Sequence, residues 1–293
     1  MKKGINQWLF PDSMNVEQCM VMAKDAGFDG LEICMGENAP KSEAGSLRLD
    51  EETGIAGYRS DLALDTREDD VKAISESAKK VGIEICSVAT ALNFRYPLTS
   101  PDTQTRAKGI EVLKMSLQSA ALLGAEVALV IPGIVTPAVS YGEAVESSEA
   151  ALRELLPTAR ETGVRMALEN VWNKFLLSPL EFRDFIDRID DNCVCALFDV
   201  ANILAYGYPD QWIDALGSRI RSIHIKDFMT SVGNINGFVN IFEGDIDWPA
   251  VMKSLRNVGY DGYLTVETIP AYKYCPESRI YESSIALDRL LNL

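Results

Sequence analysis

The stretch TRAKGIEVLKMSLQSAALLGAEVALVI (residues 105–131) contains one complete unit of a pattern that recurs along the chain. In its first part, apolar residues recur at three- and four-residue steps, which predicts an amphipathic helix over 105–123. Gly124 marks the end of that helix, because glycine adopts the left-handed conformation of a helix C-terminus without a steric penalty. The run EVALVI (126–131) then predicts a buried strand.

The same succession of a small or aliphatic residue, a glycine and an apolar run occurs at Gly27, Gly82, Gly124, Gly163, Gly217 and Gly259. With GINQWLF (4–10) and VCALFDV (194–200), it predicts eight strands, each followed by a helix; the other six are LEIC, IEICSVA, EVALVI, RMALENV, RIRSIHI and YLTVE. Such alternation is typical of parallel strands joined by right-handed crossovers. Eight units favour a closed (β/α)8 TIM barrel, α/β in class, as a single domain over 1–293.

The alternative architecture is an open, doubly wound sheet, but no G-x-G-x-x-G motif follows the first strand. One irregular segment at about 37–66, rich in Gly, Ser, Glu and Asp, follows the second strand as an insertion. Loops at that end of a barrel strand often carry function. The segment is equally compatible with an idle insertion or with a subunit contact.

Composition excludes several classes of protein. The 293 residues are 47% hydrophobic and 24% charged, as in soluble globular proteins, and the formal net charge of −15 disfavours nucleic acid and membrane surfaces as partners. No apolar stretch reaches the ~18 residues of a membrane span, and the N-terminus does not resemble a signal peptide. The six cysteines are scattered through the chain, which indicates reduced thiols and a cytoplasmic location.

Polar residues end four successive predicted strands. Apolar residues at alternate positions assign one face of each strand to the surrounding helices: Met166, Leu168, Ala196, Phe198, Ile223, Ile225, Leu264 and Val266. The other face then points to the barrel axis and carries Glu169, Asp199, His224 and Glu267. Because active sites of such barrels lie at the C-terminal ends of the strands, these four side chains are expected to meet near the barrel mouth.

Three carboxylates in one small cavity require a compensating cation, since two unit charges at ~4 Å repel by about 4 kcal/mol at an effective dielectric near 20. Each residue alone also fits a buried acid paired with lysine, or a core histidine bound to backbone. Together they predict a site for one divalent metal ion. Mn²⁺ suits three oxygen ligands and an imidazole best, with Mg²⁺, Co²⁺ or Zn²⁺ as alternatives. A structural zinc is disfavoured because no thiolate belongs to the set.

These residues lie within motifs that span the second half of the chain: ALEN (167–170), FDVAN (198–202), HIKD (224–227), EGDIDW (243–248) and GYDGYLTVE (259–267). Together they resemble the xylose isomerase-like TIM-barrel superfamily, in particular its sugar-phosphate isomerase/epimerase branch with the ketose 3-epimerases and the L-xylulose-5-phosphate (L-ribulose-5-phosphate) 3-epimerases. The resemblance implies that Glu169, Asp199, His224 and Glu267 ligate the metal. It also implies that Glu169 and Glu267 are the catalytic acid/base pair.

Position 202 departs from part of this family. Many 3-epimerases of free ketoses have a histidine three residues after the aspartate that corresponds to Asp199. This chain has Asn202 there, as members that use sugar phosphates tend to have. The resemblance therefore leans toward a phosphorylated or otherwise different substrate. Endonuclease members hold three zinc ions with many histidines, and the single histidine, His224, argues against that activity.

The residues support removal of a proton beside a carbonyl through a metal-stabilised enediolate, with one carboxylate on each face of the substrate. Trp8, Phe10 and Trp172 are expected to wall the site, or else only to pack at its rim. Asn202 is a further substrate-binding candidate. Lys226 is expected to pair with a ligand carboxylate rather than hold a substrate oxygen.

Lys174 and Arg95 are candidates for phosphate binding, or else solvated loop cations, and Glu32 and Glu243 are additional site candidates. The expected partner is a small sugar or sugar phosphate, and a homo-oligomer is left open because barrels of this family often pair. Alternatives to epimerisation are a cyclitol or keto-acid dehydratase, an aldose–ketose isomerase, and a non-catalytic sugar-binding barrel.

Overall fold

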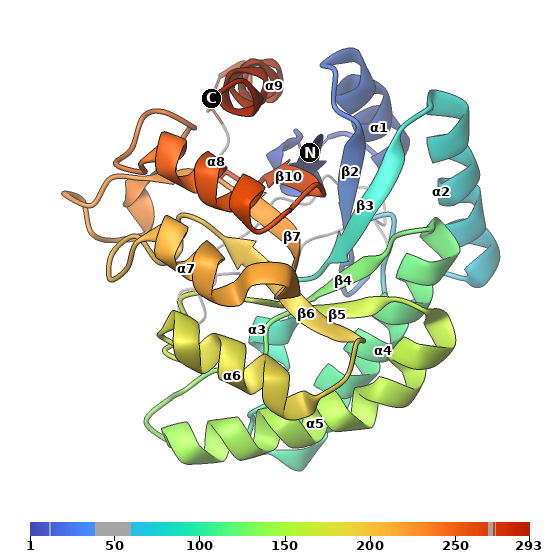
Figure 1. Cartoon of the computed structure of the whole chain (residues 1–293). Coiled ribbons are helices and arrows are strands. Elements are labelled where there is room, and N and C mark those ends of the chain that lie inside the picture. Colours follow the sequence, from blue (N-terminus) through green and yellow to red (C-terminus); the bar gives the residue numbers. More distant parts are fainter. Residues whose placement is uncertain (12, 39–59, 269–271, 273) are drawn as a thin grey trace.

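Eight parallel strands close into a barrel in the computed structural model, which describes residues 1–293 except for 12, 39–59, 269–271 and 273 (Figure 1). The strands follow one another around the barrel in the order β1-β10-β7-β6-β5-β4-β3-β2. Their bounds are β1 Lys2–Asn6, β2 Gly30–Cys34, β3 Glu84–Ala89, β4 Val127–Val130, β5 Arg165–Glu169, β6 Val194–Asp199, β7 Ile220–Ile225 and β10 Tyr263–Val266. The predicted TIM barrel and all eight of its strands are confirmed.

A long helix follows each strand, and the eight form a ring around the barrel (Figure 1). They are α1 Val16–Asp25, α2 Glu68–Val81, α4 Thr103–Leu123, α5 Tyr141–Thr162, α6 Pro179–Ile189, α7 Pro209–Leu216, α8 Trp248–Asn257 and α9 Ser278–Leu291, and a short α3 spans Leu92–Arg95. Polar side chains begin several of them. Ser140 and Glu143 form a reciprocal capping box at α5, and the Asp102 side chain accepts a hydrogen bond from the Thr105 N–H at α4.

The six glycines of the recurring pattern all have a positive φ angle. At Gly124, φ is 79° and the N–H group donates to the carbonyl oxygens of Ala120 and Ala121, which ends α4 and turns the chain into β4. A side chain is disfavoured in this conformation, so glycine at this point is a signal of helix termination that the sequence carries by itself.

The first strand is shorter than predicted. It ends at Asn6 rather than running through 4–10, because the Asn6 side chain accepts a hydrogen bond of 2.7 Å from the Trp8 N–H and starts a 3-10 turn over Gln7–Leu9. A two-stranded hairpin of β8 Asp227–Phe228 and β9 Phe238–Val239 was not predicted.

Of the irregular insertion expected at about 37–66, residues 39–59 lie outside the described part of the chain. At its edges, Gly36 pairs with Ala63 in an isolated parallel bridge.

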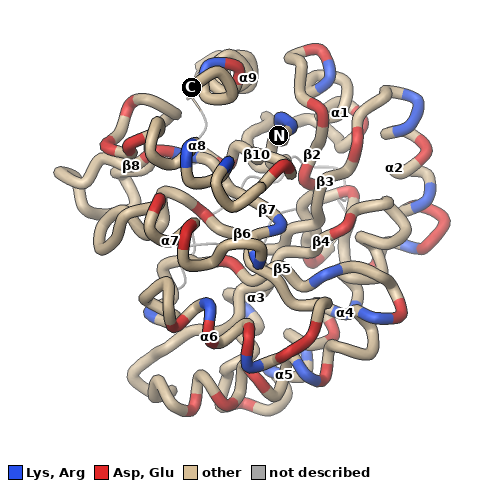
Figure 2. Tube along the Cα trace, viewed as in Figure 1, with Lys and Arg blue, Asp and Glu red and all other residues tan. Residues whose placement is uncertain are grey.

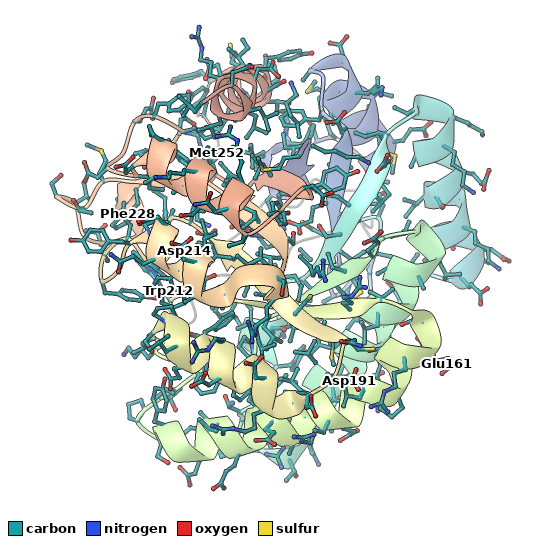
Figure 3. All side chains as sticks on the ribbon, in the orientation of Figure 1. Glu161, Asp191, Trp212, Asp214, Phe228 and Met252 are labelled. Carbon is teal, nitrogen blue, oxygen red and sulfur yellow. The ribbon has the colours of Figure 1, made fainter. Side chains whose placement is uncertain are left out.

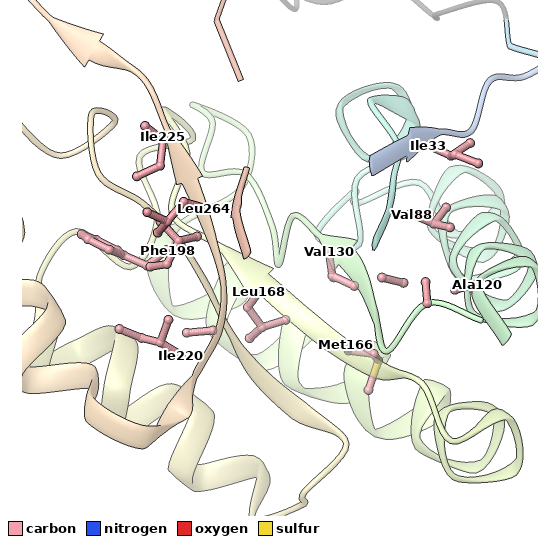
Figure 4. Close-up of a cluster of buried hydrophobic side chains, with 14 of the residues drawn as sticks. Ile33, Val88, Ala120, Val130, Met166, Leu168, Phe198, Ile220, Ile225 and Leu264 are labelled. Atoms are coloured by element: carbon pink, nitrogen blue, oxygen red, sulfur yellow. The ribbon is translucent and has the colours of Figure 1, made fainter. Parts of the chain in front are cut away.

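The strand residues separate into two apolar layers, as their alternation predicts. The helix-facing side chains belong to the main core between the sheet and the helices; Figure 4 labels Met166, Leu168, Phe198, Ile225 and Leu264 among them. Trp212 of α7, labelled in Figure 3, stacks on Phe198 with ring centroids 5.9 Å apart. The axis-facing side chains form a separate cluster inside the barrel: Cys34, Ala89, Val127, Leu129, Ile131, Ala167, Val171, Cys195 and Leu197.

Acidic and basic residues are interleaved along α2 and α5 (Figure 2). At the end of the chain, Lys3 of β1 binds Asp288 of α9 with an Nζ–Oδ1 distance of 2.8 Å, so the last helix packs beside the first strand. Among the described residues, no helix is both long enough and apolar enough to cross a bilayer.

Candidate metal and active site

Four polar side chains from neighbouring strands converge at one end of the barrel axis. Glu169 ends β5, Asp199 ends β6, His224 lies near the end of β7, and Glu267 directly follows β10. In the strand register His224 lies beside Asp199, and each residue can present one ligand atom such that all four atoms lie within 4.8 Å of one another. The side chains that alternation assigned to the axis therefore come together in the structure.

His224 is oriented by a fourth acidic residue, Glu32. Its Nε2 atom lies 2.9 Å from Oε1 of Glu32, a fully buried residue of β2. Asn6 Nδ2 donates to Glu32 Oε1 at 2.5 Å and the Ser87 hydroxyl donates to Oε2 at 2.6 Å, so both oxygens of Glu32 act as acceptors. The Nε2 atom consequently carries a proton, and Nδ1 faces the acidic cluster.

The Nδ1 atom of His224 lies 3.1 Å from Glu169 Oε1 and 3.4 Å from Glu267 Oε2. Burial opposes the charge on this imidazole, but Glu32 and Glu267 outweigh burial and raise the pKa of His224 well above its usual value. A proton on Nδ1 would lie between the ring and the two glutamates. A divalent cation can replace that proton.

Asp199 is held by the motif residues around it. Its Oδ1 atom accepts hydrogen bonds from the backbone N–H groups of Ala201 at 2.9 Å and Asn202 at 2.8 Å. The Asn170 side chain brackets the Asp199 backbone, donating to its carbonyl oxygen and accepting from its N–H group at 2.8 Å each. Oδ2 is left to face the cluster, where it contacts the Lys226 ammonium group.

Lys226 adopts the pairing that was favoured from sequence. Besides its contact with Asp199, its Nζ atom lies 2.7 Å from Glu267 Oε2 and 5.2 Å from the ring centre of Phe238. Burial disfavours the ammonium ion, yet Asp199 and Glu267 hold the pKa of Lys226 above its usual value. The lysine therefore stays charged within the cluster.

The two glutamates of the cluster differ electrostatically. Burial raises the pKa of Glu169 to about 7. Burial also opposes ionisation of Glu267, but Lys226 and His224 outweigh it and lower the pKa of that carboxyl to about 2. Burial raises the pKa of Asp199 as well, partly offset by Lys226. Buried groups whose pKa values are separated in this way are typical of acid/base sites.

The donor set fits one divalent cation. Three buried carboxylates and one imidazole nitrogen offer ligand atoms within 4.8 Å of one another. The other nitrogen of that ring is fixed by Glu32, the arrangement usual for histidine ligands of metals. Lys226 and His224 do not balance the four buried acidic residues, so further positive charge suits the cluster. The set of hard oxygen donors with a single imidazole suits Mn²⁺ or Mg²⁺ and also admits zinc.

A cavity of about 260 Å³ opens above the cluster. Six residues predicted for the site line it: Trp8, Glu169, Trp172, Asn202, Lys226 and Glu267. Asp199 and His224 are not among its lining residues and have no exposed surface. The cavity therefore meets the cluster at its two glutamates.

Four other candidates lie away from this cavity. Phe10 is buried in the main hydrophobic core. Arg95 forms an ion pair with Glu37. Lys174 lines a second, adjoining cavity, and Glu243 accepts a hydrogen bond from the Asn240 N–H in the loop after β9.

Sequence reasoning gave no role to Asp227, although it lies in the HIKD motif. This buried carboxylate accepts hydrogen bonds from Trp248 Nε1 at 2.9 Å and from the Phe242 N–H at 3.1 Å, which anchors the segment between β7 and α8. A Cβ atom at Gly244 would lie 2.2 Å from Asp227 Oδ1, so that position requires glycine. The joint occurrence of HIKD and EGDIDW was the available signal. The same segment carries Phe238 to the cavity wall.

Comparison with known proteins agrees with this architecture. The profile of the family described as xylose isomerase-like TIM barrel matches residues 21–290. An L-ribulose-5-phosphate 3-epimerase, UlaE, of Salmonella typhi is 24% identical over 278 residues, which cover 91% of this chain and 88% of that protein. An uncharacterized protein of Methanocaldococcus jannaschii, MJ1311, is 25% identical over 57% of this chain, and the match spans only 59% of that protein's length.

Two solved structures share the fold over the full chain. The crystal structure of a D-tagatose 3-epimerase-like protein superposes with a TM-score of 0.77 at 20% identity, covering 100% of this chain and 97% of that one. The crystal structure of the IOLI protein with a bound zinc atom superposes with a TM-score of 0.77 at 19% identity, covering 100% and 98%.

Proposed function

This chain belongs to the xylose isomerase-like TIM barrel family, and we propose that it is a divalent-metal-dependent ketose 3-epimerase acting on a free or phosphorylated ketose. Its relatives support the reaction class, because a protein aligned over 91% of this chain is an L-ribulose-5-phosphate 3-epimerase. Glu169, Asp199, His224 and Glu267 are the proposed metal ligands.

The observation that carries the proposal is the position of the two glutamates. Glu169 and Glu267 line the cavity, whereas the other two proposed ligands have no exposed surface. The glutamates extend from β5 and β10, which are separated around the barrel by β6 and β7. A substrate in the cavity would thus meet one carboxylate from each side, as inversion of a carbon centre requires.

In the proposed reaction one glutamate removes the proton from C3, and the other returns a proton to the opposite face. A divalent cation, when bound, supplies positive charge that makes the C–H bond beside the carbonyl more acidic. Lys226 and Asn202 line the same cavity and are proposed to bind substrate oxygens. Trp8, Leu129 and Ile131 line the wall and exclude water from the cavity, which strengthens the electrostatic interactions within it.

Mn²⁺ is the proposed metal, because three carboxylates and one imidazole suit it best. We also propose a reducing compartment, the cytoplasm, as the location. All six cysteines are free thiols, four of them buried: Cys19, Cys34, Cys86 and Cys195. Such a set suits a compartment that keeps thiols reduced.

The test is incorporation of deuterium from heavy water by the Mn²⁺-loaded protein. We expect D-tagatose, D-fructose or L-ribulose 5-phosphate to acquire one deuterium at C3 together with its 3-epimer, as followed by NMR. The Glu267→Gln variant should lose this exchange, and the Glu126→Gln variant, changed at an exposed residue next to β4, should retain it. Exchange at C1 without epimer, or a product absorbing in the ultraviolet, would instead indicate an aldose–ketose isomerase or a dehydratase.

A further inference from the structure

A second cavity of about 440 Å³ adjoins the one above the metal cluster. The two cavities share Phe94 and Trp172 in their walls, so they lie side by side at the same end of the barrel. The second is formed by the segments that follow α3, β4 and β5, and we call it the outer cavity. Its exposed wall is mostly apolar, with Pro97, Val135 and Val139 among the lining residues.

Polar groups around the outer cavity are already engaged with one another. The Thr99 hydroxyl donates to the Ile134 carbonyl oxygen at 2.8 Å and accepts from the Ile134 N–H at 2.9 Å. The Val135 N–H donates to the Asn173 carbonyl oxygen at 3.0 Å. These backbone donors therefore do not point into the cavity as an anion cradle would require. Lys174 is the one charged side chain among its described lining residues.

The shared wall is a fixed aromatic surface. Trp172 remains 39% exposed although its Nε1 atom donates a hydrogen bond of 2.7 Å to the Asn202 carbonyl oxygen. The indole also packs against Phe238 and Phe228, with ring centroids 5.1 and 5.6 Å away. These contacts fix the orientation of the indole. Its exposed surface is available to a ligand that spans both cavities. Sugar rings present apolar C–H faces that pack on such surfaces.

We propose that the outer cavity is a subsite for a second sugar ring, joined by a glycosidic bond to the ketose that reacts above the metal cluster. This inference rests on the proposed function for the identity of the reacting unit. The outer cavity is no smaller than the inner one, so a second ring fits wherever a ketose fits the first. Lys174 at its wall can donate hydrogen bonds to ring hydroxyls. The substrate class is therefore a keto-disaccharide with a free C3 hydroxyl.

The test compares isomaltulose, in which glucose is attached through O6 of fructose, with D-fructose alone. Titration calorimetry on the Mn²⁺-loaded protein should give a dissociation constant at least tenfold lower for isomaltulose. Val135→Trp fills the outer cavity and should remove that difference, with fructose binding unchanged within twofold. The matched control is Val21→Trp, on the exposed face of α1, which should preserve the difference.

If Val135→Trp does not fold, Thr136→Trp obstructs the same cavity from an exposed position. Isomaltulose binding no tighter than fructose, or a preference that survives both substitutions, overturns the subsite. Tighter binding of fructose 6-phosphate that depends on Lys174 overturns it in favour of an anion site. Because these measurements record binding, they separate the two proposals: a ring preference without deuterium exchange at C3 would leave the subsite standing and refute the epimerase.

Discussion

The two halves of the barrel differ sharply at the end that carries the site. The strands β5, β6, β7 and β10 contribute Glu169, Asp199, His224 and Glu267. The strands β3 and β4, together with the residue after β4, contribute small and apolar side chains to the same interior, including Ala89, Leu129 and Ile131. One half concentrates charge and the other half keeps water away from it. Both are needed because buried charges interact strongly only where solvent is excluded.

Glu32 is a charged residue in the apolar half, where Asn6 of β1 and Ser87 of β3 donate hydrogen bonds to it. It extends from β2 across the barrel interior and binds His224, a residue 192 positions later in the sequence. It therefore belongs to the charged half by function and to the apolar half by position. We call the hydrogen bond between Glu32 and His224 the crossing contact.

The largest effect is expected within the charged half. Glu169→Gln removes a proposed ligand and one acid/base group, so kcat/KM for the C3 epimerisation should fall by about 10³-fold. Replacement by glutamine also removes a buried ionisable group, and we expect the unfolding temperature of the metal-free protein not to decrease. Steady-state kinetics and calorimetric unfolding measure the two quantities.

The matched control for this variant is Glu126→Gln. Its side chain is 87% exposed beside β4, so its activity should stay within twofold of the unmodified protein. Retention of full activity by Glu169→Gln would refute the assignment of catalytic charge to this half of the barrel.

A smaller effect is expected at the crossing contact. Glu32→Gln keeps the shape of the side chain but weakens its hold on the Nε2–H of His224, so Mn²⁺ affinity should fall by about 10–100-fold. Titration of Mn²⁺ by electron paramagnetic resonance measures this without reference to turnover. The control is Glu84→Gln, which changes the exposed first residue of β3. This variant should bind Mn²⁺ normally. Unchanged affinity in Glu32→Gln would show that the contact does not position the histidine.

The smallest effect is expected in the apolar half. Ile131→Val and Ile33→Val remove the same methylene group from buried positions, and each should cost about 0.5–1.5 kcal/mol of unfolding free energy. Ile131 lines the cavity, whereas Ile33 packs toward the helices, so only Ile131→Val should raise KM, by severalfold. Equal KM values in the two variants would argue that the cavity wall does not contact substrate.

Most helices and strands could be predicted from the sequence, because the residues that indicate each of them lie within a few positions of one another. Gly124 ends its helix by its own conformation, and the alternation that places Met166 and Leu168 outward also turns Glu169 inward. The same reasoning failed where a side chain redirects the backbone, as Asn6 does when it ends β1 early. It could not give the hairpin β8–β9 either, since two-residue strands have no periodicity to detect.

Part of the site could not be predicted because it depends on contacts between distant residues. The four proposed ligands share a recognisable position at strand ends, but nothing near Glu32 in the sequence indicates that it meets His224. Likewise, Phe10 is a large apolar residue close to Trp8 in the sequence, yet it packs in the core. The turn after β1 directs Trp8 to the cavity instead. Such choices follow from tertiary packing.

The most direct test of the account is anomalous diffraction from crystals of this protein soaked in Mn²⁺. We predict one strong anomalous peak per chain, bonded to carboxylate oxygens of Glu169, Asp199 and Glu267 and to Nδ1 of His224, with Nε2 still bound to Glu32. A chain that takes up no manganese at this position, or whose four side chains stay bound to one another around Lys226 with the ion elsewhere, would contradict it.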